Sequence, residues 1–296
     1  MADPDPGNAI SGSDVEVLAP GTQIAPGYEV VEHISRGDAL DVYEVFSAER
    51  LCSCIAKTIR PDRADIPRVQ ARLLQEGRLL QELTHPLLVR GYETITEPQI
   101  VVIVETVTAL NLEELLDERP RRLPVADVCH LGRHVAAATH YLHGQGYLHL
   151  DIRPANVLAD SGLAKLIDLS LARPPGPIPR GLGSREHMAP EQAAGEPATA
   201  AADVWGIGVT LYEAVTCVRP FAPLDEHEEQ VVLPEVRYLQ LHRPAPPLSR
   251  WRRRLPRDFV SIVEACLQRD PGKRPSVTSL WDALGEVIGN LEPVEP

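Results

Sequence analysis

The stretch that decides the fold reads His149-Leu150-Asp151-Ile152-Arg153-Pro154-Ala155-Asn156, and a second acid, Asp168, follows it beyond a short hairpin pattern. The carboxylate of Asp151 can orient a hydroxyl group or accept its proton, and Arg153 can neutralise a phosphoryl group in transfer. Asn156 and Asp168 offer hard oxygen ligands, which suit Mg²⁺ bound together with phosphates. Each residue alone is more typical of a turn or a cap, so their joint spacing is what indicates a phosphate-handling site.

The hairpin pattern explains how these residues would converge. Val157-Leu158 and Leu166-Ile167 flank the turn signal Asp160-Ser161-Gly162, which would bring Asn156 and Asp168 to the same end of one short ribbon. Beyond Leu110 the apolar spacing is helical, and the segment 204–215 is apolar nearly all round, as in a central buried helix. Further helices are expected at 112–116, 131–142, 259–267 and 277–288.

The first third of the chain is strand-like and contains one helix. Strands are expected at 28–34, 41–46, 52–59 and 100–104, with Gly37 in the loop between the first two. The helix carries a stripe of side chains on one face, formed by Val69, Leu73, Glu76, Leu80 and Leu83. A carboxylate inside an apolar stripe costs free energy unless a cation meets it, so Glu76 is predicted to have a cationic partner.

These patterns predict an α+β fold in two lobes. A small antiparallel-sheet lobe with one helix would span 28–107, and a larger, mainly helical lobe would span 108–290. Residues 1–27 are rich in Pro, Gly, Asp and Ser with few large apolar side chains, and we expect a disordered tail there. Residues 291–296 are expected to form a C-terminal tail.

Composition excludes several classes of protein. The chain has 296 residues, 44% of them apolar and 24% charged, which is ordinary for a globular protein. Its net charge of −13 argues against nucleic-acid binding. No apolar run approaches the ~20 residues of a membrane span, and the acidic N-terminus lacks the apolar core of a secretory signal. Five scattered Cys residues argue for a reducing compartment and against zinc, so we expect a cytoplasmic location.

Several ordered motifs together resemble the protein kinase family over residues 28 to 288. The segment 149–156 resembles the family's catalytic loop, and Asp168-Leu169-Ser170 resembles its metal-binding triplet. Further matches are Met188-Ala189-Pro190-Glu191, the start of the buried helix at 203–208, and 267–275 with its Arg274. The resemblance implies a two-lobed kinase fold that binds ATP and Mg²⁺ between its lobes. Segment 183–187 is similar to the substrate loop of kinases that act on protein Ser or Thr, with the Ser184 hydroxyl supporting Asp151.

The resemblance also implies a role for each site residue. Lys57 would hold the ATP phosphates with Glu76 as its partner, Asp151 would be the catalytic base or orienting group, and Arg153 would stabilise charge. Asn156 and Asp168 would bind Mg²⁺. The implied nucleotide contacts are Ile34, Gly37, Val42, Lys57, Glu76, Glu105, Val107, Leu158 and Asp168. Glu191 and Arg274 would form a structural ion pair.

Departures from the family pattern leave alternatives open. Ser35, Gly37 and Leu40 stand where three glycines recur, Ile55 replaces a small Ala beside adenine, and Ser170 replaces a glycine. These changes predict weaker nucleotide binding, and they keep a catalytically inactive binding module of the same fold as the alternative to an active kinase. A small-molecule phosphotransferase is disfavoured because Met188–Glu191 and Arg274 belong to the protein-substrate architecture.

The sequence also predicts how activity is regulated and what several surface segments do. Leu150 stands where many kinases have Arg, and 171–183 contains no Ser, Thr or Tyr, so activity is predicted not to depend on phosphorylation of this loop. The acidic run 225–229 and the Arg-rich run 250–254 are either partner surfaces or solvated segments. The four His residues between 130 and 143 favour a packed or solvated helix face over a metal site. The oligomeric state does not follow from the sequence.

Overall fold

The computed structural model describes residues 16–107, 109–118, 122–160, 162–223 and 236–291. These residues form two compact units. The N-terminal unit contains the described residues up to Glu82 together with Arg90–Thr106, and the C-terminal unit contains Leu83–Val89 and the described residues from Val107 onward. Residues 83–89, which the sequence placed in the first lobe, therefore belong to the second.

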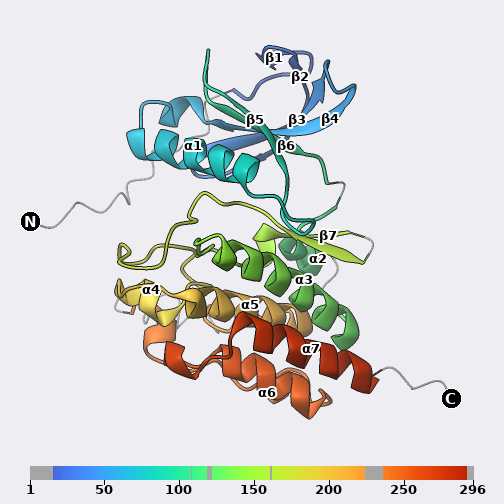
Figure 1. Cartoon of the computed structure of the whole chain (residues 1–296), viewed down its shortest axis with the longest axis vertical. Coiled ribbons are helices and arrows are strands. Elements are labelled where there is room, and N and C mark those ends of the chain that lie inside the picture. Colours follow the sequence, from blue (N-terminus) through green and yellow to red (C-terminus); the bar gives the residue numbers. More distant parts are fainter. Residues whose placement is uncertain (1–15, 108, 119–121, 161, 224–235, 292–296) are drawn as a thin grey trace, which may run out of the picture. The chain divides into compact units, whose positions relative to one another are not determined.

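A single antiparallel sheet and one helix build the N-terminal unit (Figure 1). The strand order is β1-β2-β3-β4-β6-β5. The strands are β1 (Gln23–Ala25), β2 (Tyr28–Arg36), β3 (Leu40–Ser47), β4 (Cys52–Ile59), β5 (Gly91–Ile95) and β6 (Val101–Glu105), and the helix is α1 (Pro67–Glu82). β3 and β4 alternate between buried and half-buried side chains, as strands with one face on a core do.

The N-terminal segment departs from the expected tail. Gln23–Ala25 pairs with β2, and Ile24 and Ala25 are buried in the sheet's hydrophobic core together with Tyr28 and Tyr43. A three-residue strand carries no periodic signal of its own, so the composition of 1–27 concealed it. Residues 1–15 lie outside the described part of the chain.

Helix α1 lies close against β5 and β6 because it has a glycine where it crosses them. A Cβ atom at Gly77 would collide with the side chains of Thr94 and Val102. The missing side chain lets the helix backbone approach the sheet, and this close approach buries the neighbouring residue, Glu76, completely.

Helices dominate the C-terminal unit, as expected. They are α2 (Leu112–Glu118), α3 (Val125–Gly144), α4 (Pro190–Ala194), α5 (Ala200–Thr216), α6 (Arg257–Cys266) and α7 (Val277–Leu291). Strands β7 (Val157–Asp160) and β8 (Leu163–Leu166) form the predicted hairpin. Short 3₁₀ helices occur at Pro61–Arg63 in the first unit and at Pro154–Asn156, Leu239–Leu241, Leu248–Arg250 and Pro271–Lys273 in the second.

Helix α5 is the centre of this unit. Its side chains are buried from Ala202 to Thr216, in agreement with its apolar pattern. α3 packs against both α5 and α7, and α6 packs against α5 and α7, so the four helices lie side by side (Figure 1). Within the described residues, no helix combines the length and apolar character that a membrane crossing requires.

Candidate active site

The buried carboxylate of Glu76 meets the predicted cation. Lys57 Nζ on β4 lies 2.6 Å from Glu76 Oε1 on α1, and the two side chains are 13% and 0% exposed. Strand alternation places Ile55 on the same face of β4 as Lys57. On the neighbouring strand β3, Val42 pairs with Lys57, and on the other neighbour β6, Val104 pairs with Ile55. The lysine thus stands on a sheet face lined by branched apolar side chains.

Arginines brace the loop between β2 and β3. Arg36 donates hydrogen bonds of 2.7 and 2.9 Å to the two carboxylate oxygens of Asp41, which is 1% exposed. Arg60 Nη1 donates to the Gly37 carbonyl at 3.0 Å. Because Asp41 precedes Val42 on β3, it points to the sheet face opposite Lys57. One ion pair and one hydrogen bond to a backbone carbonyl therefore support a loop that has only one of the three expected glycines.

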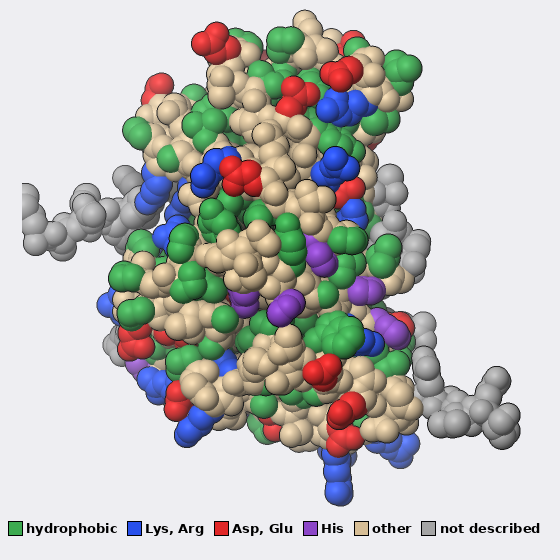
Figure 2. Space-filling view, viewed as in Figure 1, with side chains coloured by type: hydrophobic (Ala, Val, Ile, Leu, Met, Phe, Trp, Pro, Cys, Tyr) green, Lys and Arg blue, Asp and Glu red, His purple; other side chains and the backbone are tan. Residues whose placement is uncertain are grey.

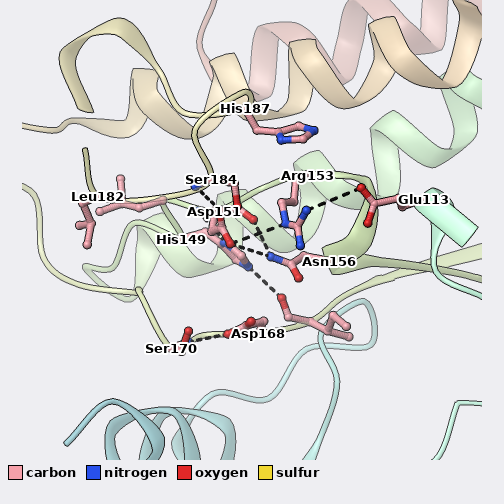
Figure 3. Close-up of polar contacts among 12 residues, drawn as sticks. Glu113, His149, Asp151, Arg153, Asn156, Asp168, Ser170, Leu182, Ser184 and His187 are labelled. Atoms are coloured by element: carbon pink, nitrogen blue, oxygen red, sulfur yellow. Dashed lines mark hydrogen bonds and ion pairs between the residues drawn. The ribbon is translucent and has the colours of Figure 1, made fainter. Parts of the chain in front are cut away.

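The carboxylate of Asp151 accepts hydrogen bonds on both oxygens (Figure 3). Asn156 Nδ2 donates to Oδ2 at 3.1 Å and to the Asp151 carbonyl at 2.8 Å. The backbone N–H of Ser184 donates to Oδ1 at 3.0 Å. Arg153 Nε lies 3.9 Å from Oδ2. The sequence predicted a supporting hydroxyl at Ser184, whereas the contact in the structure comes from its backbone amide.

Asp203 on α5 holds the backbone of the catalytic loop through its carboxylate. Its carboxylate accepts hydrogen bonds from the backbone N–H groups of His149 at 2.8 Å and Leu150 at 2.7 Å. His143 Nε2 lies 2.8 Å from the same carboxylate, which is 1% exposed. These contacts hold Leu150 at a left-handed φ of 65°. The sequence did not assign this role to Asp203, although an acid in a helix that is apolar all round was a readable signal.

The hairpin brings the two expected metal ligands to one end. Val157 pairs with Leu166, and just beyond this pair Ile167 N donates to the Asn156 carbonyl at 3.0 Å, so Asn156 and Asp168 flank the open end of the ribbon. Asp168 adopts φ 67° and accepts from Ser170 N at 3.0 Å.

This donor set fits a magnesium ion. Asn156 donates from its amide nitrogen to Asp151, so its carbonyl oxygen is the atom that would contact a cation. One amide oxygen and one carboxylate are hard ligands of the type that Mg²⁺ takes when phosphates and waters complete its shell.

Backbone hydrogen bonds hold the segment 171–183 in place. Leu148 and Arg173 exchange two hydrogen bonds of 2.8 and 3.1 Å. Gly181 N donates to the Gln192 carbonyl at 2.8 Å, and Gln192 Nε2 donates to the carbonyls of Leu150 and Leu182 at 2.9 and 2.8 Å. The segment is thereby joined to the catalytic loop through one buried amide side chain.

The expected ion pair between Glu191 and Arg274 is confirmed. Arg274 donates to both carboxylate oxygens of Glu191 at 2.7 and 2.8 Å, and the two side chains are 0% and 4% exposed. Arg274 Nη1 also donates to the Ala201 carbonyl at 2.8 Å. The pair joins α4 to the segment that precedes α7.

The remaining predicted nucleotide contacts divide between the two units. Ile34 on β2 is 48% exposed, and Glu105 at the end of β6 accepts from Arg90 N at 2.9 Å. Val107 and Leu158 belong to the C-terminal unit. The structure thus brings together Lys57 with Glu76 and Val42 in one unit, and the catalytic loop with Asp168 in the other.

The histidines of α3 lie on a packed and partly open face. Figure 2 shows His side chains, in purple, over this helix. His130 and His134 line a hollow of about 500 Å³ with Leu131 and Leu163. His134 Nδ1 accepts from Ala164 N, and burial, followed by nearby His130 and Arg133, lowers the pKa of His134. Within the described residues, no group of three or more His, Cys, Asp or Glu side chains is arranged to hold a metal ion.

In the Arg-rich run 250–254, two arginines make contacts within the fold. Arg252 Nη1 donates to the Leu123 carbonyl at 2.8 Å, and the Arg250 guanidinium lies 4.9 Å from the centre of the Trp251 ring. These two arginines are used within the fold. The acidic run 225–229 lies outside the described residues.

Comparison with known proteins shows which family the residues around this site resemble. The family model for the protein kinase domain matches residues 28–283. The serine/threonine-protein kinase PkaA of Streptomyces coelicolor is 31% identical over 249 residues, covering 79% of this chain and 43% of the relative. The serine/threonine-protein kinase PknD of Protochlamydia amoebophila is 26% identical, covering 90% of this chain and 29% of the relative. The chain thus spans less than half the length of these curated relatives.

The solved structures agree on the fold. The kinase domain of PknI from Mycobacterium tuberculosis superposes with a TM-score of 0.69 at 25% identity, covering 91% of this chain and 99% of the solved domain.

Proposed function

The chain belongs to the protein kinase family, and on this basis we propose that it transfers the γ-phosphate of ATP to Ser or Thr hydroxyls of a protein substrate. One observation carries the proposal: both oxygens of the Asp151 carboxylate are held, by Asn156 and by the Ser184 amide, beside the guanidinium of Arg153. A carboxylate oriented in this way can receive the proton of an incoming hydroxyl. The relatives PkaA and PknD are both named as serine/threonine-protein kinases.

In the proposed reaction, different residues bind the phosphates, bind the metal and accept the proton. Lys57, oriented by Glu76, would hold phosphate oxygens of ATP, and Asn156 and Asp168 would hold Mg²⁺. The metal would neutralise charge on the phosphates when bound. The substrate hydroxyl oxygen forms the new bond to the γ-phosphorus, the bond to the ADP oxygen breaks, and the hydroxyl proton passes to Asp151. The protein contributes mainly positioning and charge stabilisation.

We further propose that this activity does not require phosphorylation of the segment 171–183. The segment has no hydroxyl side chain, and Leu150, which is 2% exposed, stands where an Arg receptor for phosphate would be expected. Backbone hydrogen bonds to Leu148 and Gln192 support the segment instead. Phosphatase treatment should leave the transfer rate unchanged within about twofold, and a loss of an order of magnitude or more, together with a phosphate mapped to 171–183 by mass spectrometry, would contradict this proposal.

The second candidate is a binding module without catalysis. Ser35 and Leu40 in place of glycines favour it because they bring side chains into a loop that otherwise approaches phosphate through its backbone. Ile55 favours it too, since its branched side chain lies on the same sheet face as Lys57.

Transfer of labelled phosphate from ATP to a generic Ser/Thr protein substrate distinguishes the two candidates. The wild-type chain should incorporate label, and Asp151→Asn should lower the rate by about a hundredfold or more, as removal of a general base does. An unchanged melting temperature would show that the variant is folded. Equal incorporation by both proteins would contradict the role of Asp151. A wild type that gains thermal stability with Mg²⁺-ATP but transfers no label would favour the binding module.

A further inference from the structure

Arg219, which follows α5, sits among three carboxylates. Its Nη2 lies 2.9 Å from Glu113 Oε1, its Nη1 lies 3.5 Å from Glu186 Oε2, and its Nε lies 4.0 Å from Glu213 Oε2. The three acids come from three separate parts of the C-terminal unit: the first turn of α2, the loop before α4 and the end of α5. A guanidinium with contacts in three directions fills the space that these acids surround.

This cluster adjoins the residues that would receive the substrate. Glu113 Oε1 also lies 3.8 Å from Arg153 Nη1, and Arg153 lies 3.9 Å from Asp151 (Figure 3). Glu186 follows Ser184, whose amide contacts Asp151, by two positions. An extended peptide advances ~3.3 Å per residue. A peptide with its hydroxyl at Asp151 would therefore bring side chains a few positions from the phosphoacceptor close to Glu113 and Glu186.

The burial of the acids shows which of them depends most on a cation. Glu213 is 5% exposed and has His187 Nε2 at 2.8 Å, while Glu186 and Glu113 are 19% and 28% exposed. Arg219 itself is 42% exposed. Without its guanidinium, the acids would lose a cation that they share, and a partly exposed hollow of negative charge would open beside the catalytic loop. A basic side chain from a peptide is the group that such a hollow attracts.

We propose, resting on the proposed kinase function, that Arg219 is a specificity-determining residue: it occupies the place of a basic substrate side chain and so prevents selection of Arg or Lys near the phosphoacceptor. Specificity arises from such repulsive elements as well as from attractive ones. A substrate Arg would meet the positive charge of Arg219 rather than three available carboxylates.

The test compares kcat/KM for two peptides that differ only in whether Arg or Gln occupies the second to fourth positions on either side of a single Ser. The wild type should prefer the Arg peptide by no more than about twofold. Arg219→Gln should raise this preference about fivefold, the upper end of what a partly exposed ion pair contributes. Arg219→Lys retains the charge and should behave as the wild type does. Arg254→Gln removes an exposed arginine outside this cluster and serves as the matched control.

A second change locates the effect. Combining Glu113→Gln with Arg219→Gln should cancel part of the gained preference for the Arg peptide, because one attracting carboxylate is then lost. An active Arg219→Gln enzyme with the wild-type preference would overturn the inference, as would a wild type that already strongly favours the Arg peptide.

The inference can fail separately from the proposed function. A wild type that phosphorylates neither peptide would contradict the kinase proposal, and fluorescence anisotropy of the labelled Arg peptide would still test Arg219. Tighter binding to Arg219→Gln than to the wild type would support the inference, and equal binding would overturn it. Should Arg219→Gln fail to fold, Arg219→Met, which retains much of the aliphatic stem, provides the same comparison.

Discussion

At the scale of single residues, Glu76 shows how a charged side chain is accommodated inside an apolar stripe of a helix. Burial of a carboxylate demands a cation, and the structure supplies Lys57 at 2.6 Å. The stripe alone could not say which cation, since the pairing joins a strand to a helix. Only the family resemblance selected Lys57. The reverse holds for Ser184, where the residue was identified but the contacting atom was a backbone N–H rather than the hydroxyl.

Asp203 leads to a prediction at the same scale. Asp203→Asn keeps the shape of the side chain but replaces an anion that accepts from two backbone amides and contacts His143. Hydrogen bonds to a buried charged group contribute about 1.5–3 kcal/mol each, so we expect the free energy of unfolding to fall by at least about 2 kcal/mol. Urea denaturation followed by circular dichroism measures it. A change below about 0.5 kcal/mol would show that the carboxylate charge does not anchor the loop.

At the scale of elements, hydrophobic periodicity predicted the long helices and the central strands, because each buries one face or all of its surface. It did not separate out β1 or β5. β5 is half-buried throughout and begins with Gly91, so it lacks the alternation that identifies a strand. The brace on the β2–β3 loop also went unpredicted, because Arg36 and Asp41 meet only when the two strands pair.

The ion pair between Glu191 and Arg274 tests how elements of the C-terminal unit are joined. Arg274→Ala leaves the buried Glu191 carboxylate without its bidentate partner. Loss of one member of a buried pair typically costs about 3–5 kcal/mol, and we expect a loss of that size in the free energy of unfolding. The exposed Arg253→Ala should change it by less than about 0.5 kcal/mol. Urea unfolding curves that coincide for the two variants would contradict a structural role for the pair.

At the scale of the whole molecule, the sequence predicted a sheet unit followed by a helical unit, since the apolar spacing becomes helical beyond Leu110. It could not predict that residues 83–89 join the helical unit. Leu88 and Val89 lie beside Leu166 of β8, a contact between segments far apart in the chain. Contacts between distant segments also position the site. The Ser184 amide donates to Asp151, and Asp203 accepts from the backbone of the catalytic loop.

Two buried histidines contribute to the pH dependence of global stability. Burial lowers the pKa of His85 and of His134 below the ordinary value of 6.5. The unfolded chain therefore binds more protons than the folded one as pH falls through 6.5, and stability should fall in that direction. We expect the melting temperature to drop between pH 7.5 and pH 5.5.

Two substitutions check this origin. His134→Gln retains an acceptor for the Ala164 amide but does not titrate, so its melting temperature should fall less over the same pH range. His242→Gln, at an exposed position, should reproduce the wild-type slope. Identical slopes in all three proteins would exclude His134 as a source of the pH dependence.

The proposed function requires that Lys57 and Asp168 each contribute to the binding of Mg²⁺-ATP. Calorimetric titration of Mg²⁺-ATP into the wild type, Lys57→Met, Asp168→Asn and the double variant tests it most directly. Each single change should weaken binding at least about tenfold, or ~1.4 kcal/mol, and the double variant should lose less than the sum because both groups contact one ligand. Single variants that fold and bind Mg²⁺-ATP as tightly as the wild type would contradict the account.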